Sequence, residues 1–389
     1  MKNIKKYLLL AFIIENLLAQ TRILGGTSVF FYVFLVAGGY FLLEGSAFKK
    51  EVNESCKCLF SLAMVYILYQ FTLGFGTISF RTLLYLLAKV TTFIIIAISV
   101  TSDWEFYAKK TPQFFSIGVL LVLMYGLLTG QNSSVNGRQL IGFTNANTTS
   151  TLGAIAFAGF LFFRNRQNSK TYLFAMFLCL YAMLAGGSRN GMLLFAIILF
   201  MWRGVSLKSI PVVVGLFAMV IVLTEQFHIE LSGIDRLIGT ARGEIGANRD
   251  VEREAAIMMI RESPWTGWGF EAQNVGRAAM ISELGSHSGY LETLKFMGYP
   301  FAVIWFLVLF VGVKRCLKLY THGVEIRYHL AIVIASIISA FFEGLFVGVH
   351  EVGTNLFFVS LAVLTTYEYK QRKINRKKYV ENHNNMSGV

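Results

Sequence analysis

The stretch GSHSGYLETLKFMGYPFAVIWFLVLFVGV, residues Gly285 to Val313, decides the fold class of this chain. Its first part is polar and contains His287, and from Phe301 onward it is an almost unbroken apolar run. A helix needs about 20 mostly apolar residues to cross a bilayer, whereas strands would alternate polar and apolar side chains. We therefore expect residues 287–313 to form a membrane-spanning helix with His287 at its mouth.

Composition extends this expectation to the whole chain. Hydrophobic residues make up 55% of the 389 residues, only 15% are charged, and the mean hydropathy is +0.58. These values exclude an ordinary soluble domain and predict an all-α polytopic membrane protein with about twelve transmembrane helices. The expected spans are residues 6–23, 26–44, 57–76, 81–100, 113–129, 148–164, 170–186, 190–203, 209–225, 287–313, 329–345 and 354–367.

The distribution of lysine and arginine predicts the topology. These residues resist translocation, and in this chain they gather in alternate loops and in the tail KQRKINRKK. We expect both termini to be cytoplasmic, residues 6–23 to be a first span rather than a cleaved signal peptide, and residues 368–389 to be a basic cytoplasmic tail. The net charge of +13 is then explained by anchoring to anionic lipids, so nucleic acid is not an expected partner.

The chain is expected to form a single transmembrane domain, residues 1–389, with one large external loop. This loop, residues 225–286, lies between the ninth and tenth spans. About 60 residues are too few for a separate catalytic domain. We therefore expect any active site to lie where the loop meets the external ends of the helices.

Arginines on the expected external face are candidate anion ligands. The segment GGSRNG places Arg189 in a short hairpin between two spans, and NRDVEREAAIMMIRESPWTGWG predicts a surface helix that starts near Asn248. Arg249 and Arg253 are four residues apart and share one face of that helix. Guanidinium groups match the oxygens of a diphosphate, although pairing of the helix arginines with nearby acids such as Glu252 is an open alternative.

His287 is the candidate general base, since a neutral imidazole can take a proton from a sugar hydroxyl. The alternative is that it caps the helix or lies at the interface. Glu343 falls within an expected span, where a carboxylate needs a partner or a function, and Lys89 and Lys295 are candidate partners. Glu292 and Lys295, three residues apart, are expected to pair with each other.

These motifs resemble, in order, those of the O-antigen ligase and Wzy-type polysaccharide polymerase superfamily. The matching segments are GRQLIGFTNANTTSTLG (residues 137–153), GGSRNG, Arg249 with PWTGWG, and His287 followed after ten residues by Gly298. The resemblance covers about residues 138–310. Ala146 stands where the family often has proline, which leaves the role of Asn147 open, and Arg253 stands where it often has tryptophan.

The resemblance implies a GT-C-like fold in the bacterial inner membrane, with the active site on the external, periplasmic face. The implied reaction is a metal-independent, inverting transfer of a glycan from undecaprenyl diphosphate to a sugar hydroxyl. Arg189 and Arg249, with Arg253 beside them, would bind the diphosphate, and His287 would be the catalytic base. Arg138, Asn147 and Glu343 are further candidates for the acceptor or for holding the loops.

We expect no cofactor and no metal, because a zinc site of His228, His287, His350 and Glu351 lacks a known ligand spacing. Three functions stay open: a repeat-unit polymerase, which we favour, a ligase that transfers the glycan to a lipid core or another acceptor, and a glycolipid transporter. The expected partners are the lipid-linked oligosaccharide and membrane lipids, with a chain-length regulator and a flippase as further ones.

Overall fold

The computed structural model describes residues 2–24, 29–45, 49–131, 133–135, 138–163, 169–203, 247–270 and 287–386. Nearly all of this part of the chain is helical, and the sheet within it is one short antiparallel hairpin. The elements are α1 (Lys2–Ala19), α2 (Val29–Leu43), α3 (Lys50–Ser55), α4 (Lys57–Phe71), η2 (Phe75–Thr77), α5 (Phe80–Ser102), α6 (Trp104–Leu128), β1 (Ser134–Val135), β2 (Arg138–Gln139), α7 (Ala146–Phe162), α8 (Ser169–Gly186), α9 (Arg189–Arg203), α12 (Ala247–Glu262), α14 (Gly289–Leu317), η6 (Lys318–Thr321), α15 (Val324–Ser339) and α16 (Val352–Met386).

The all-α prediction is confirmed, and each expected span that the structure describes coincides with a helix. The expected ninth span, residues 209–225, lies outside the described residues. Within the described ranges, three helical segments are long and apolar enough to cross a membrane, namely Phe80–Ser102, Trp104–Leu128 and Gly289–Thr321. Five shorter apolar helices accompany them. The count of twelve spans and the GT-C-like topology therefore stay predictions.

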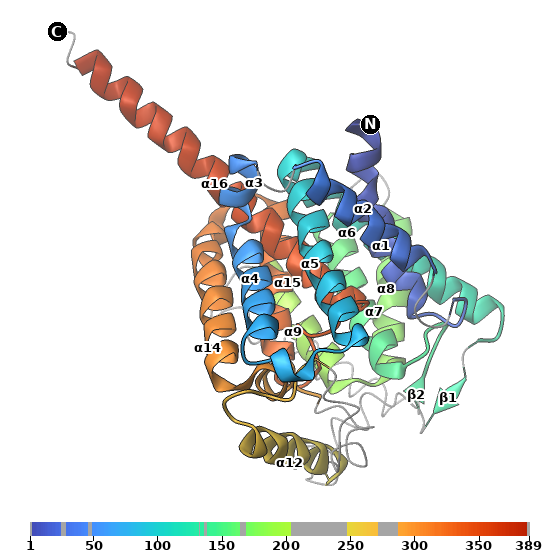
Figure 1. The fold of residues 1–389 in the computed structure, drawn as a ribbon. Coiled ribbons are helices and arrows are strands. Elements are labelled where there is room, and N and C mark those ends of the chain that lie inside the picture. The colour runs from blue at the N-terminus through green and yellow to red at the C-terminus, as the bar shows by residue number, and fades with distance from the viewer. Residues whose placement is uncertain are drawn as a thin grey trace.

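The helices form a bundle with two distinct ends (Figure 1). The start of α1 and the far end of α16 lie at one end, and α12 and the β1–β2 hairpin lie at the other. Both ends of the chain therefore lie at one end of the bundle, the arrangement that an even number of crossings would produce. We call the end with α12 the α12 end of the bundle.

The helices at the last two expected spans differ in length from those spans. The eleventh span was expected to reach residue 345, but α15 ends at Ser339. In the turn that follows, the carbonyl oxygens of Ala340 and Glu343 accept from the backbone N–H of Gly289 in α14, at 2.8 Å and 2.9 Å, so another helix satisfies them. The twelfth span was expected to end at residue 367, and its helix, α16, continues beyond that residue to Met386 through the basic tail. That tail is rich in Lys and Arg, which favour helix.

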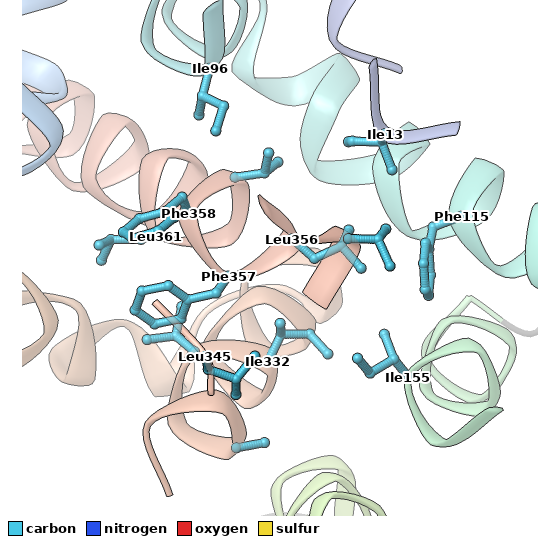
Figure 2. Packing of buried hydrophobic residues seen from close by; sticks show 14 of the residues in the cluster. Ile13, Ile96, Phe115, Ile155, Ile332, Leu345, Leu356, Phe357, Phe358 and Leu361 are labelled. Atoms are coloured by element: carbon cyan, nitrogen blue, oxygen red, sulfur yellow. The ribbon is translucent and has the colours of Figure 1, made fainter. Parts of the chain in front are cut away.

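The first half of α16 lies in the middle of the apolar core. Figure 2 shows Leu356 and Phe357 of α16 among Phe115 of α6, Ile155 of α7 and Ile332 of α15, all of which are buried. Apolar burial of this kind fixes the helices of the bundle relative to one another. The ends of α7, α9 and α15 are thereby held at defined positions.

The turn between α15 and α16, residues 340–351, is tied to the bundle by polar side chains. The Lys89 ammonium of α5 donates to the carbonyls of Phe346 and Gly348, each at 2.7 Å, and His350 pairs with Glu15 of α1 at 2.8 Å. Lys89 was expected to be a partner of Glu343, but its hydrogen bonds go to backbone carbonyls. The turn carries Glu343, so these contacts fix where that carboxylate lies.

Candidate functional site

The hairpin between α8 and α9 begins the candidate site. As expected from GGSRNG, only Gly187 and Ser188 separate the two helices, and Gly187 has a positive φ of 61°. The Ser188 hydroxyl accepts a bond from the N–H of Gly191 at 3.4 Å, which caps the first turn of α9. Arg189 is the first residue of α9 and is partly buried. The Arg189 side chain is therefore attached at a helix N-terminus, and the dipole of the helix favours anions there.

Arg138 supports this hairpin. Its Nε donates to the carbonyl of Gly186 at 2.8 Å, and its guanidinium also donates to the side-chain oxygen of Asn147. Asn145 caps α7 by accepting from the N–H of Asn147 at 2.8 Å. Arg138 and Asn147 thus join β2, the start of α7 and the end of α8. Of the two roles expected for Arg138, these contacts favour the loop-supporting one.

His287 lies between two carboxylates. Its Nε2 is 3.4 Å from Oε2 of Glu252 in α12, and its Nδ1 is 3.9 Å from Oε2 of Glu343 in the turn after α15. The imidazole is 37% exposed, whereas the side chain of Glu252 is only 8% exposed. His287 also has a φ of 48°, in the left-handed region that few non-glycine residues adopt. The imidazole of His287 is thus attached to a backbone position with a left-handed conformation.

Burial of the polar turn raises the pKa of Glu351, and the nearby carboxylate of Glu343 adds to that rise. The Thr354 hydroxyl donates to Glu351 at 2.7 Å and, with the positive charge of Lys89, opposes the rise. Two carboxyl groups therefore interact in this turn, one of which also contacts His287. The surroundings of the imidazole are acidic on the side of α15.

The expected surface helix is confirmed as α12, Ala247–Glu262. It starts one residue before Asn248, which therefore is not its cap. Its inner face consists of Glu252, Ala255, Ala256, Met259 and Ile260, all buried, whereas Arg253 is exposed. Arg249 lies in the helix backbone, but its side chain lies outside the described residues. Arg249 is three residues before Glu252 in the sequence, which is less than one helical turn.

The segment that follows α12 is locked into a kink of α14. Gly298 has φ 65° and ψ 175°, which interrupts the helix and exposes carbonyls in its first half. The N–H of Trp268 donates to the oxygen of Lys295 at 2.9 Å, and that of Gly269 donates to the oxygen of Phe296 at 3.0 Å. The Trp268 indole also donates to Met259 of α12 at 2.8 Å. The PWTGWG motif and Gly298 thus fix α12 beside the start of α14, where His287 lies.

Replacement of Gly267 by alanine is expected to break this docking. Gly267 has φ 65°, and an added Cβ would lie 2.4 Å from the oxygen of Phe296. A left-handed alanine costs about 1–2 kcal/mol and the overlap about 1–3 kcal/mol more. Thermal unfolding in detergent should therefore show a lower Tm for Gly267→Ala. Gly76→Ala is the matched control, since a Cβ there meets nothing within 4 Å; equal Tm values for the two variants would contradict the docking role.

Two other sequence expectations concern ion pairing and metal binding. Lys295 pairs with Glu292 at 2.6 Å, both buried, as expected from their spacing. Within the part of the chain that the structure describes, no three His, Cys, Asp or Glu side chains are grouped so that they could hold a metal ion. His228, one member of the zinc set considered above, lies outside the described residues.

Glu252 is the residue whose position sequence reasoning missed. It was considered only as a neighbour that could pair with the arginines of its own helix, but it contacts His287. One signal was present: Glu252 is in register with Ala255, Ala256, Met259 and Ile260, the apolar positions of α12. An acid on the apolar face of a helix is expected to meet a partner across the interface.

Part of the chain that contains the candidate site matches the model of a known family. Residues 174–306 match the family model described as O-antigen ligase, Wzy_C. The match confirms the resemblance found from the motifs, and it contains the α8–α9 hairpin, α12, the docked PWTGWG segment and His287. Arg138, Asn147 and Glu343 lie outside the matched segment. A search of the curated proteins found no match.

Proposed function

Given the match to the O-antigen ligase family, we propose that this chain is an inner-membrane glycosyltransferase that polymerises surface-polysaccharide repeat units. The donor is a glycan on undecaprenyl diphosphate, and the acceptor is a sugar hydroxyl of a second lipid-linked unit at the outer leaflet. The observation that carries the proposal is that the Arg189 hairpin and the carboxylate-flanked His287 are at the α12 end of one bundle. In this proposal the arginines bind the leaving diphosphate and His287 serves the acceptor at that end of the bundle.

The proposed division of labour follows from charge. Negative charge grows on the diphosphate as its bond to the anomeric carbon breaks, and the guanidiniums of Arg189 and Arg249 stabilise that charge. His287 takes the proton of the acceptor hydroxyl while the hydroxyl oxygen attacks the opposite face of the same carbon. Direct displacement inverts the anomeric configuration. Arg253, exposed beside this region, would meet the outer part of the diphosphate.

Arg138 and Asn147 hold the α8–α9 hairpin in this proposal, and Glu343 orients the imidazole through Nδ1. These residues act through Arg189 and His287. The chain-length regulator, the flippase and the cytoplasmic position of both termini belong to the same proposal. They follow from the pathway class and from the arrangement of the basic residues.

Purified protein incubated with its lipid-linked repeat unit alone should produce a ladder of products that differ by one repeat. A polymerase needs no other acceptor, because the same molecule serves as donor and acceptor. The description of the matched family favours a second candidate, a ligase that transfers the glycan to a lipid core. Formation of product only after a foreign acceptor is added would establish the ligase and contradict the polymerase.

Turnover in detergent separates both transferases from a transporter. Detergent micelles have no compartments, so a transporter would leave the repeat units chemically unchanged there. A ladder in detergent therefore excludes transport as the sole activity.

A further inference from the structure

Glu252 has an unusual environment for an acid on a surface helix. It is nine-tenths buried, its Oε2 lies 3.4 Å from Nε2 of His287, and among the described residues this oxygen has no hydrogen-bond partner. Two residues later Glu254 is exposed to solvent, as acids on such helices usually are. Burial of a carboxylate oxygen without a hydrogen bond costs free energy, and each such oxygen in a folded protein calls for an explanation.

Hydrogen-bond chemistry limits what Oε2 of Glu252 and Nε2 of His287 can bind together. A neutral imidazole donates from one nitrogen and accepts at the other, and a carboxylate only accepts. Glu343 is fixed beside His287, because the N–H of Gly289 donates to the Glu343 carbonyl at 2.9 Å, and its carboxylate suits an N–H at Nδ1. Nε2 of His287 and Oε2 of Glu252 are then two acceptors side by side. This arrangement fits a ligand that brings two neighbouring donors.

We propose that Glu252 is an acceptor-binding residue and that the acceptor sugar presents two adjacent hydroxyls, a vicinal diol, to Glu252 and His287. This inference rests on the proposed function. The hydroxyl at Nε2 passes its proton to the imidazole as its oxygen bonds to the anomeric carbon, and the electron pair of the broken bond leaves on the diphosphate. The neighbouring hydroxyl donates to Glu252 and keeps its proton. The substrate class is thus an acceptor whose reacting hydroxyl has a free hydroxyl beside it.

The inference explains why α12 is locked so firmly to α14. The contacts of Trp268 and Gly269 with the kink at Gly298 fix the distance between the helix that carries Glu252 and the helix mouth that carries His287. Two hydrogen-bond acceptors must be held at a constant distance from each other to bind two hydroxyls of one sugar ring. The proposed specificity therefore depends on the PWTGWG motif as well as on Glu252.

The test uses purified full-length protein and its own lipid-linked repeat unit, together with derivatives that lack one hydroxyl of the terminal acceptor sugar. Loss of a hydrogen bond to a charged group should lower kcat/KM for the acceptor about 10- to 100-fold. Glu252→Ala should show this loss with the natural acceptor. Glu252→Gln, which keeps an accepting oxygen, should recover part of it, and Glu254→Ala, on the same helix, should match the wild type.

The deciding measurement combines the variant with the derivatives. One deoxy acceptor should lose the same factor on the wild-type protein and lose nothing further on Glu252→Ala, because both changes remove one interaction. If the two losses multiply, or if the wild type uses every deoxy acceptor as well as the natural one, the inference is wrong. The comparison of deoxy and natural acceptors on the wild type needs no variant, so it tests the inference even if Glu252→Ala fails to fold. Absence of any transfer by the wild type would instead overturn the proposed function.

Discussion

Replacement of His287 by asparagine is expected to lower the rate of glycan transfer by a factor of about 10²–10⁴, the usual contribution of a positioned general base. Asparagine is chosen because it tolerates a left-handed backbone, and His287 has a φ of 48°. The variant therefore keeps the local fold and a polar side chain, but it has no group that can take a proton at neutral pH. The measurement is the rate of ladder formation by purified protein at saturating lipid-linked unit.

His322→Asn is the matched control for this experiment. His322 lies beyond the other end of α14, where its ring contacts the carbonyl of Leu319, far from the α12 end of the bundle. This variant should retain the wild-type rate. Thermal unfolding of His287→Asn in detergent should resemble that of the wild type, since asparagine adopts the left-handed backbone of this position readily. A wild-type rate for His287→Asn would show that another group deprotonates the acceptor.

The parts of this site that the sequence predicted are those determined by residues close together in the chain. Glycine content and hydropathy located the α8–α9 hairpin, proline and glycine located the end of α12, and i,i+3 spacing paired Glu292 with Lys295. Each depends on residues within one or two helical turns. For such features the pattern of residue types contains the needed information.

The parts that sequence did not predict depend on contacts between distant segments. Glu252 meets His287 where Trp268 and Gly269, which follow α12, dock at the Gly298 kink of α14. The eleventh span ends early, and Gly289 of another helix satisfies the carbonyls of Ala340 and Glu343 in the turn that follows. Hydropathy continues through those residues, so it cannot report where the helix stops. The docking beside the Glu252–His287 contact and the end of α15 both involve hydrogen bonds between segments that are distant in the sequence.

Replacement of Arg189 by alanine is expected to lower the transfer rate about 10²–10³-fold, the loss typical when one donor to a developing negative charge is removed. Arg189 begins α9, and a guanidinium and the N–H groups of a first helical turn each favour negative charge. Charge on the diphosphate increases as the glycosidic bond breaks. The effect should therefore fall mainly on kcat, with a smaller effect on KM for the donor.

Two further variants distinguish this role from general electrostatics. Arg189→Lys keeps the charge but loses the planar fork that binds two phosphate oxygens, so it should recover only part of the rate. Arg203→Ala removes an exposed arginine at the opposite end of the same helix, and its rate should equal that of the wild type. If Arg203→Ala and Arg189→Ala reduced the rate equally, the loss would reflect net charge or insertion of α9. A deficit specific to Arg189, at equal protein and equal Tm, is what a diphosphate ligand at this helix start requires.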